Sequence, residues 1–132
     1  MGGHYKHNNK IMITLMSYGF KFGRPEANIV FDVSLFKNPW RVEDLKATEK
    51  TSKVKKTKII EFMVKQKGVY QFCQNVADIV KQYDTLFPDE NITVALCCSA
   101  GEYRSPALVE IVNKLLPKEI KRKIIQSKNS KI

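Results

Sequence analysis

Short stretches of apolar and β-branched residues, separated by polar or glycine-containing segments, predict the strands of this protein. The first stretch runs from Ile11 to Phe20, the second from Ala27 to Val33 and the third from Ile92 to Cys97. The third is apolar throughout, as expected for a strand that is covered on both faces. A fourth strand is predicted within Ile120 to Ser127, and we expect the chain after it to fray.

Helical periodicity marks the segment between the second and third strands. Thr48 to Lys58 is polar and lysine-rich, and we expect a loop that becomes helical towards its end. An apolar helical face begins at Ile59, and Gly68 interrupts it. A longer helix is predicted from Val69 to Leu86, where apolar residues recur at helical spacing.

A further helix is predicted directly after the third strand. Serine is a preferred N-cap residue and proline suits the first helical position, so Ser105 and Pro106 are expected to start this helix. Its apolar stripe runs to Leu116, and Pro117 ends it. The resulting order, β-β-α-α-β-α-β, predicts a small α/β fold in which helices pack on a mainly parallel sheet.

The length of 132 residues suits one domain with a single core. We expect a disordered leader over residues 1–10, the domain over 11–127 and a basic tail over 128–132. The cysteines and histidines show no zinc-ligand spacing, so neither a metal nor another cofactor is expected. The sequence shows no secretory segment and no apolar run of membrane-spanning length, so we expect a cytoplasmic protein without a membrane partner.

The chain carries a formal net charge of +10, and the positive excess is clustered. Eight lysines lie between residues 46 and 67, and five lysines and one arginine lie between 118 and 132. Such clusters favour an anionic partner, and we expect RNA. Because aromatic residues do not interleave with the lysines, the contacts would go to phosphates rather than bases, with steep salt dependence. The candidate RNA-binding residues are Lys53, Lys55, Lys56, Lys58, Lys118, Lys121, Arg122 and Lys123.

The loop between the third strand and the following helix is the main candidate for a ligand site. Residues 97–105 read Cys-Cys-Ser-Ala-Gly-Glu-Tyr-Arg-Ser. A loop of small residues that leads into a helix presents backbone N–H groups and the positive end of the helix dipole to an anion. The guanidinium of Arg104 adds a forked, permanently charged donor. The sequence therefore predicts a site for a phosphate or another oxyanion.

Two residues of this site also have a purely structural interpretation. Cys98 either lines the ligand or is a small buried residue beneath a turn. Arg104 either meets an anion or forms a salt bridge to Asp32, and both hold if Asp32 keeps Arg104 in place. Four aromatic residues are expected in the core rather than as base-stacking platforms, namely Tyr18, Phe20, Phe31 and Phe36.

Two parts of the sequence together resemble a known family. The first part comprises Ser17–Pro25, Ala27–Val33 and Asn38–Trp40, and the second is Cys98–Ser105. In order and spacing they resemble the carboxy-terminal domain of RapZ, a family of RNase adapter proteins. The resemblance spans about Met12 to Leu116.

The resemblance implies a regulatory or adapter domain that binds glucosamine 6-phosphate and small RNAs and makes self-contacts in an oligomer. In RapZ a P-loop kinase-like domain precedes this domain. The present sequence has no GxxxxGK[ST] motif, so it resembles a stand-alone version, and nucleotide hydrolysis is not implied. The resemblance and the loop chemistry together indicate these ligand-binding residues: Ser17, Lys21, Asp32, Cys98, Ser99, Ala100, Gly101, Glu102, Tyr103, Arg104 and Ser105.

The chain departs from the family pattern at positions that would contact and recognise the sugar. Phe22 and Tyr103 stand where the family has histidines, Ser34 replaces an arginine, and Ala100 and Glu102 are also changed. The anion-binding positions are retained, namely Lys21, Asp32, Cys98, Gly101, Arg104 and Ser105. These differences imply a phosphorylated small molecule, a phosphosugar or a nucleotide-like anion, without specifying the family's sugar.

Cys98 and Arg104 also fit the Cys-x5-Arg loop of cysteine-dependent phosphatases. In such enzymes a thiolate attacks phosphorus while the loop N–H groups and the arginine stabilise the equatorial oxygens. An aspartate general acid on a separate loop is also needed, and Asp44 is the best candidate because Asp78 and Asp84 fall in a predicted helix. Three hypotheses therefore remain open: a binding module for RNA or a phosphorylated small molecule, a phosphatase with Cys98 and Arg104 as catalytic residues, and a pure interaction protein.

Overall fold

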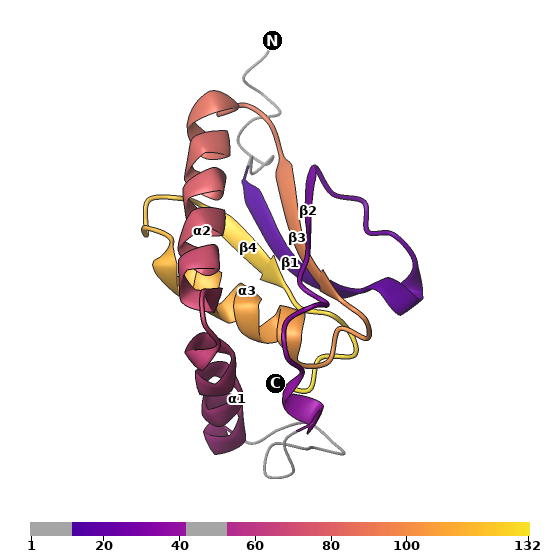
Figure 1. The fold of residues 1–132 in the computed structure, drawn as a ribbon. Helices are drawn as coiled ribbons and strands as arrows, with labels where there is room; N and C mark the ends of the chain where they lie inside the picture. Colours follow the sequence, from indigo (N-terminus) through magenta and orange to yellow (C-terminus); the bar gives the residue numbers. More distant parts are fainter. Residues whose placement is uncertain (1–11, 42–52) are drawn as a thin grey trace.

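A computed structural model describes residues 12–41 and 53–132, and it has the predicted order of elements (Figure 1). The strands are β1 (Ile13–Gly19), β2 (Ile29–Asp32), β3 (Ile92–Cys98) and β4 (Arg122–Ile125). The helices are α1 (Lys53–Lys65), α2 (Val69–Leu86) and α3 (Arg104–Leu115), with two short 3-10 helices, η2 (Phe20–Phe22) and η3 (Pro39–Arg41). The expected leader, Asp44 and the first part of the lysine-rich segment lie outside the described residues.

The four strands form one sheet in the order β2-β3-β1-β4, and every neighbouring pair is parallel. The predicted α/β fold is therefore confirmed. After β1 the chain moves towards the β2 edge, whereas after β3 it moves through α3 towards the β4 edge. Adjacent strands whose connections leave in opposite directions open a crevice at their carboxyl ends, which is where α/β sheets commonly bind ligands.

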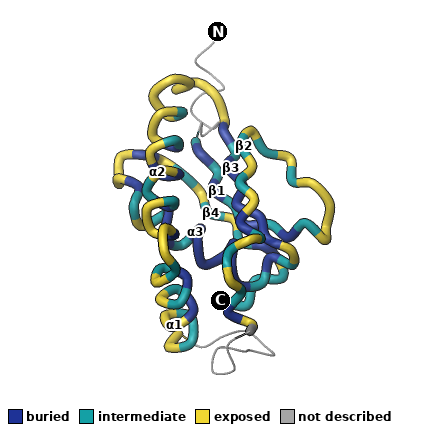
Figure 2. Tube along the Cα trace, in the orientation of Figure 1, coloured by how far each residue is buried: buried dark blue, intermediate teal, exposed yellow. Residues whose placement is uncertain are grey.

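All three helices contribute to one apolar cluster on one face of the sheet (Figure 2). The sheet supplies alternate residues, which include Ile13 and Leu15 of β1 and Val94 and Leu96 of β3. A period of two places such residues on the same side of a strand. Of the four aromatic residues expected in the core, Phe31 and Phe36 pack against this cluster, whereas Tyr18 and Phe20 are half-buried outside it.

The start of α3 differs from the prediction. Tyr103 is the N-cap residue, without a side-chain capping bond, and Ser105 lies inside the helix. The reason is tertiary, because the buried Ser105 hydroxyl lies 3.2 Å from Cys98 Sγ and donates to the carbonyl of Tyr18 at 3.4 Å. These contacts across the sheet replace the local capping bond that the sequence predicts.

A frayed end after β4 is the other expectation that the structure corrects. The backbone N–H of Lys131 donates to the carbonyl of Glu102 at 2.9 Å, and the Asn129 side chain donates to the carbonyl of Ala100 at 3.3 Å. Ile132 is only 8% exposed and joins the apolar cluster. We call residues 127–132 the C-terminal segment, and it packs against the loop between β3 and α3.

Over residues 12–41 and 53–132, no helix combines the length and apolar character needed to cross a membrane. Within the same ranges, histidine, cysteine and carboxylate side chains form no group of three or more that could hold a metal ion.

Candidate anion-binding site

The loop of residues 99–103 lies over the carboxyl end of β1, against Gly19. A Cβ atom added to Gly19 would lie 2.6 Å from the carbonyl carbon of Ala100. The backbones of β1 and the loop therefore approach too closely for any side chain at this position. Glycine at the end of β1 is what allows the loop to lie this close.

Neighbouring segments hold the loop by its carbonyl groups. The N–H of Lys21 donates to the carbonyl of Ser99 at 3.0 Å, and the C-terminal segment binds the carbonyls of Ala100 and Glu102. In a trans peptide the C=O and the next N–H point in opposite directions. The N–H groups of Ala100 and Gly101 therefore point away from these neighbours, and no acceptor for either is recorded within the described part of the chain.

Gly101 allows the tight contact between the loop and the C-terminal segment. Its φ of 71° is in the left-handed region, and a Cβ added there would lie 2.4 Å from Ser127 Oγ. Ser127 is itself held by Ser17, whose hydroxyl accepts its N–H at 2.7 Å and donates to Gln126. The buried Ser17 is thus engaged in fixing the segment beneath the loop.

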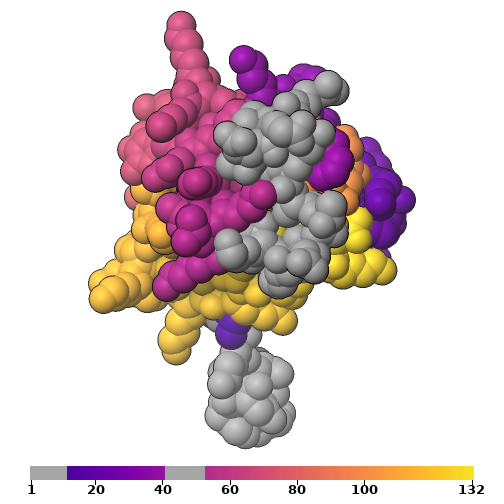
Figure 3. Space-filling view, turned by 90° about the horizontal axis from the view of Figure 1, so that it is seen from below, coloured from indigo at the N-terminus to yellow at the C-terminus, as the bar shows by residue number. Residues whose placement is uncertain are grey.

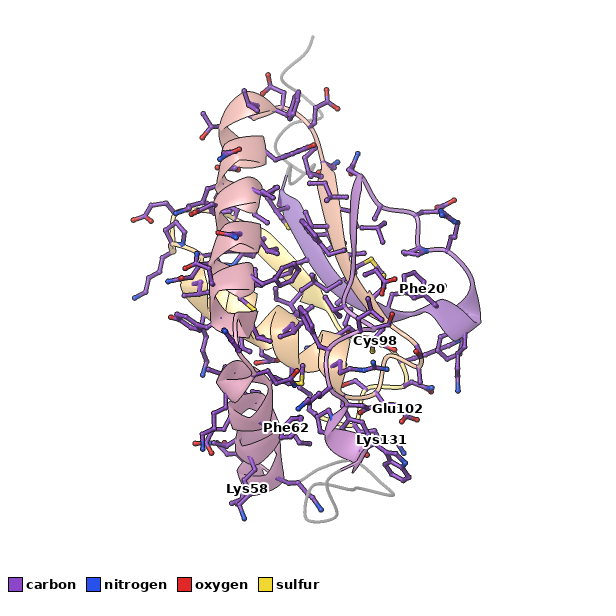
Figure 4. The ribbon with its side chains drawn as sticks, viewed as in Figure 1. Phe20, Lys58, Phe62, Cys98, Glu102 and Lys131 are labelled. Carbon is purple, nitrogen blue, oxygen red and sulfur yellow. The ribbon has the colours of Figure 1, made fainter. Side chains whose placement is uncertain are left out.

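Cys98 and Ser105 lie under the loop. The Cys98 side chain is 2% exposed, and its sulfur accepts the N–H of Ser105 at 3.4 Å. The alternative of a small buried residue beneath a turn therefore describes the position of Cys98 (Figure 4). Burial raises the pKa of the adjacent Cys97 to about 11, so this second thiol stays protonated at neutral pH.

Arg104 connects the loop to the segment after β2. Its guanidinium donates to the carbonyls of Ser34 and Phe36, the latter at 3.3 Å, and reaches Ser99 Oγ at 3.4 Å. The side chain is 8% exposed, and no ion pair to Asp32 or to another carboxylate is found for it within residues 12–41 and 53–132. The salt bridge considered from the sequence is therefore not formed. The direct hydrogen-bond acceptors of this buried positive charge are all neutral, which leaves it able to attract an anion in addition to the nearby Asp32 carboxylate.

Asp32 instead organises the turn that presents these carbonyls. Its carboxylate accepts the Ser34 hydroxyl at 2.6 Å and the Ser34 N–H at 2.9 Å. These two bonds lower the pKa of Asp32, and the nearby Arg104 lowers it further. Asp32 thus acts on Arg104 through the turn between residues 32 and 36.

A cavity of about 750 Å³ opens beside Arg104. Of the residues predicted for the site, Ser99 and Arg104 line it. Six lining residues were not predicted, and they are Ser34, Leu35, Phe36, Lys37, Asn38 and Phe62. The Asn38-Pro39 turn signals a loop here, but no local pattern reveals that Phe62 faces it from α1.

The side chain of Gln66 fixes the backbone of Lys37, one of the residues that line this cavity. Its amide accepts the N–H of Lys37 at 2.9 Å and donates to the carbonyl of Lys37 at 3.0 Å. This pair of bonds imitates one rung of a β-ladder. The segment of residues 34–38 is therefore tied both to Arg104 and to the end of α1.

The remaining predicted ligand residues do not line this cavity, and Ser17 lines a different one between β1 and the chain after β4. Lys21 is exposed, with its amine 5.5 Å from the centre of the Phe22 ring. Tyr103 is 1% exposed and stacks on Trp40 at 6.2 Å between ring centres. Glu102 is half-buried and lies beside Lys131 at the C-terminal segment (Figure 4). The site that the structure assembles is centred on Ser99 and Arg104.

The candidate RNA-binding residues fall into two groups. Lys53, Lys55, Lys56 and Lys58 lie on α1, whose magenta surface is prominent in Figure 3. Lys56 is partly used in an ion pair with Glu110 of α3 at 3.5 Å. The second group lies on the connection from α3 to β4 (Lys118 and Lys121) and on β4 itself (Arg122 and Lys123). Arg122 donates to Asn113, Pro117 and Ile120. The Arg122 guanidinium thus already has protein acceptors, whereas Lys118, Lys121 and Lys123 are exposed.

The fold is that of an α/β domain in which a strand–loop–helix segment lies beside a cavity. The chain belongs to the RapZ C-terminal domain family, whose sequence model matches residues 11–130. This confirms the resemblance seen in the two sequence signatures.

Proteins with similar sequences support this family assignment. A nucleotide-binding protein of Caldicellulosiruptor saccharolyticus is 34% identical over 110 residues, which cover 80% of this chain and 36% of that protein. A nucleotide-binding protein of Caldanaerobacter subterraneus is 32% identical over 114 residues, or 83% of this chain and 38% of the relative. A third, from Fervidobacterium nodosum, is 33% identical over 110 residues, or 80% of this chain and 37% of the relative. The chain thus spans little more than a third of the length of these relatives.

Proposed function

We propose that this chain is a binding module that holds a phosphorylated small molecule in the cavity beside Arg104. The anion would meet the Arg104 guanidinium and the Ser99 hydroxyl, and the loop N–H groups would add to the positive potential. The observation that carries the proposal is Arg104 itself: it is 92% buried, lines the cavity and has only neutral acceptors within the described residues.

The names of the relatives support a phosphate-bearing ligand in general terms. They are called nucleotide-binding proteins, but most of their length lies outside the part that matches this chain. Their name therefore does not say which part of them binds the nucleotide. The local chemistry of the cavity carries the proposal for this chain.

Isothermal titration calorimetry with inorganic phosphate and glucosamine 6-phosphate tests the proposal. Arg104→Lys keeps the charge but loses the forked donor, and we expect affinity to fall by at least about tenfold, since a charged hydrogen bond contributes about 1.5–3 kcal/mol. Arg122→Lys is the matched control, because Arg122 also donates to backbone carbonyls but lies at the opposite, amino-terminal end of the strands. Equal losses in both variants, or no binding by the unaltered protein, would contradict the proposal.

We also propose that the module binds RNA through its lysines in a regulatory or adapter role. The clustered positive charge on α1 supports this, as does membership of the family. Exchanging the exposed Lys53 and Lys58 for Gln should lower the slope of log affinity against log salt by about 0.7 per lysine for single-stranded RNA. Lys114→Gln, an exposed lysine of α3, is the control. An unchanged slope would remove α1 from the RNA surface.

One observation supports a cysteine-dependent phosphatase as the second candidate. The Cys98 sulfur accepts the N–H of Ser105 and lies 3.2 Å from its hydroxyl, so the cysteine and the arginine of the Cys-x5-Arg pattern flank one loop. The depth of Cys98 and the engagement of Arg104 with carbonyls favour binding without cleavage. Hydrolysis of p-nitrophenyl phosphate that disappears in Cys98→Ser would establish the enzyme, and its absence in the unaltered protein would leave the binding module.

A further inference from the structure

The cavity beside Arg104 is much larger than a phosphate group requires. Its volume of about 750 Å³ is in the range of pockets that enclose whole organic ligands, about 300–1,000 Å³. A bare anion at Arg104 would leave most of this space unused. The residues that line the rest of the cavity therefore indicate which chemical groups the ligand carries besides its phosphate.

The lining of the cavity is chemically mixed. Ser99, Lys37 and Arg104 supply polar and positive groups. Phe62, from α1, and Leu35, which is 94% exposed, supply apolar groups. Figure 4 shows Phe62 on α1, the helix that approaches the segment following β2.

The backbone of residues 34–38 is held at a fixed place relative to the guanidinium. Phe36, which also lines the cavity, packs edge-on against Phe72 at 5.4 Å between ring centres. Gln66 ties the backbone of Lys37 to the end of α1, and Arg104 ties the carbonyl of Phe36 to the loop. Because these bonds order the cavity before binding, they lower the entropic cost of binding a ligand that contacts both Arg104 and the apolar residues.

We propose that the ligand of this cavity is a nucleoside monophosphate, with its phosphate at Arg104 and its base against Phe62. This inference rests on the proposed function, and it narrows the ligand class. A base offers a flat apolar face to an aromatic side chain, and such contacts are sequence-tolerant because every base has a π-face. A phosphosugar has no planar π-face to stack on Phe62, and its hydroxyl groups would find no hydrogen-bond partner in the side chains of Phe62 and Leu35.

Calorimetry on the full chain with inorganic phosphate, ribose 5-phosphate and AMP tests the inference. AMP should bind about 5- to 150-fold more tightly than ribose 5-phosphate, the range expected for stacking of one base. Phe62→Ala should reduce AMP to the affinity of ribose 5-phosphate and leave ribose 5-phosphate unchanged. Phe62→Tyr keeps the ring and should keep the preference. Tyr70→Ala is the control, because Tyr70 is an exposed aromatic residue of α2 that does not line the cavity.

The outcomes separate this inference from the proposed function. If ribose 5-phosphate and AMP bind equally, and Arg104→Lys weakens both, the base contact is refuted while the anion site stands. If none of the three probes binds, both the anion site and the nucleotide are refuted. The comparison of probes on the unaltered protein decides the question even if Phe62→Ala does not fold.

Discussion

The contact between the loop and the C-terminal segment makes a quantitative prediction for Gly101→Ala. Gly101 has a φ of 71°, and an alanine in this region costs about 1–2 kcal/mol. Its Cβ would also lie 2.4 Å from Ser127 Oγ and 3.0 Å from the N atom of Gly19. Overpacking of this kind costs about 1–3 kcal/mol more. The free energy of unfolding should therefore fall by about 2–5 kcal/mol, the sum of these two costs.

Gly68→Ala is the matched control for this prediction. Gly68 has a similar φ of 83°, but nothing lies within 4 Å of an added Cβ. Its substitution should therefore show the backbone cost alone. Urea unfolding followed by circular dichroism measures both variants and compares their losses directly.

A second change locates the clash. Ser127→Gly removes both Ser127 atoms that crowd the new Cβ, so it should restore part of the stability that Gly101→Ala loses. A coupling energy of about 0.5–3 kcal/mol is expected in the double-mutant cycle. Equal losses for Gly101→Ala and Gly68→Ala, with no coupling to Ser127, would refute the packing of the C-terminal segment on the loop.

Three further predictions concern the surroundings of the site. Ser34→Ala should raise the pKa of Asp32, measured by NMR titration, because it removes the hydroxyl bond that lowers this pKa most and leaves only the backbone N–H bond. Since the folded pKa is the lower one, the stability that these bonds add is present above about pH 4 and lost as pH falls through the folded pKa; an unchanged pKa would contradict the turn described here. Burial raises the pKa of Cys73 to about 12, so at pH 8 this thiol should react with Ellman's reagent only after unfolding, and fast reaction of the folded protein would show that the core is open. Gln66→Ala should lower the unfolding free energy by about 1 kcal/mol and weaken ligand binding, whereas Gln71→Ala, on the exposed side of α2, should do neither.

The helices and strands could be predicted from the sequence because their signals are local. The periodicity and Gly68 define α2 with its observed bounds, and the apolar run from Ile92 identifies β3. The parallel sheet follows from the alternation of strands and helices. These features depend on neighbours within one element, which a sequence pattern contains.

The parts that could not be predicted depend on contacts between distant segments. Ser105 looks like a helix cap, but its hydroxyl is used by Cys98 and Tyr18, which lie on other strands. Phe62 and Gln66 carry no recognisable motif, and only the fold brings them to the loop after β2. The loop chemistry thus identified Arg104, while the composition of the cavity around it required the three-dimensional structure.

The most direct test of the anion site is a titration of the ¹⁵N-labelled protein with inorganic phosphate, followed by NMR. We expect saturable shifts of the Arg104 side-chain Nε–H and of the Ala100 and Gly101 amides, and their loss in Arg104→Lys. Shifts confined to the α1 lysines, or shifts of the loop amides that persist in Arg104→Lys, would contradict an anion site at Arg104.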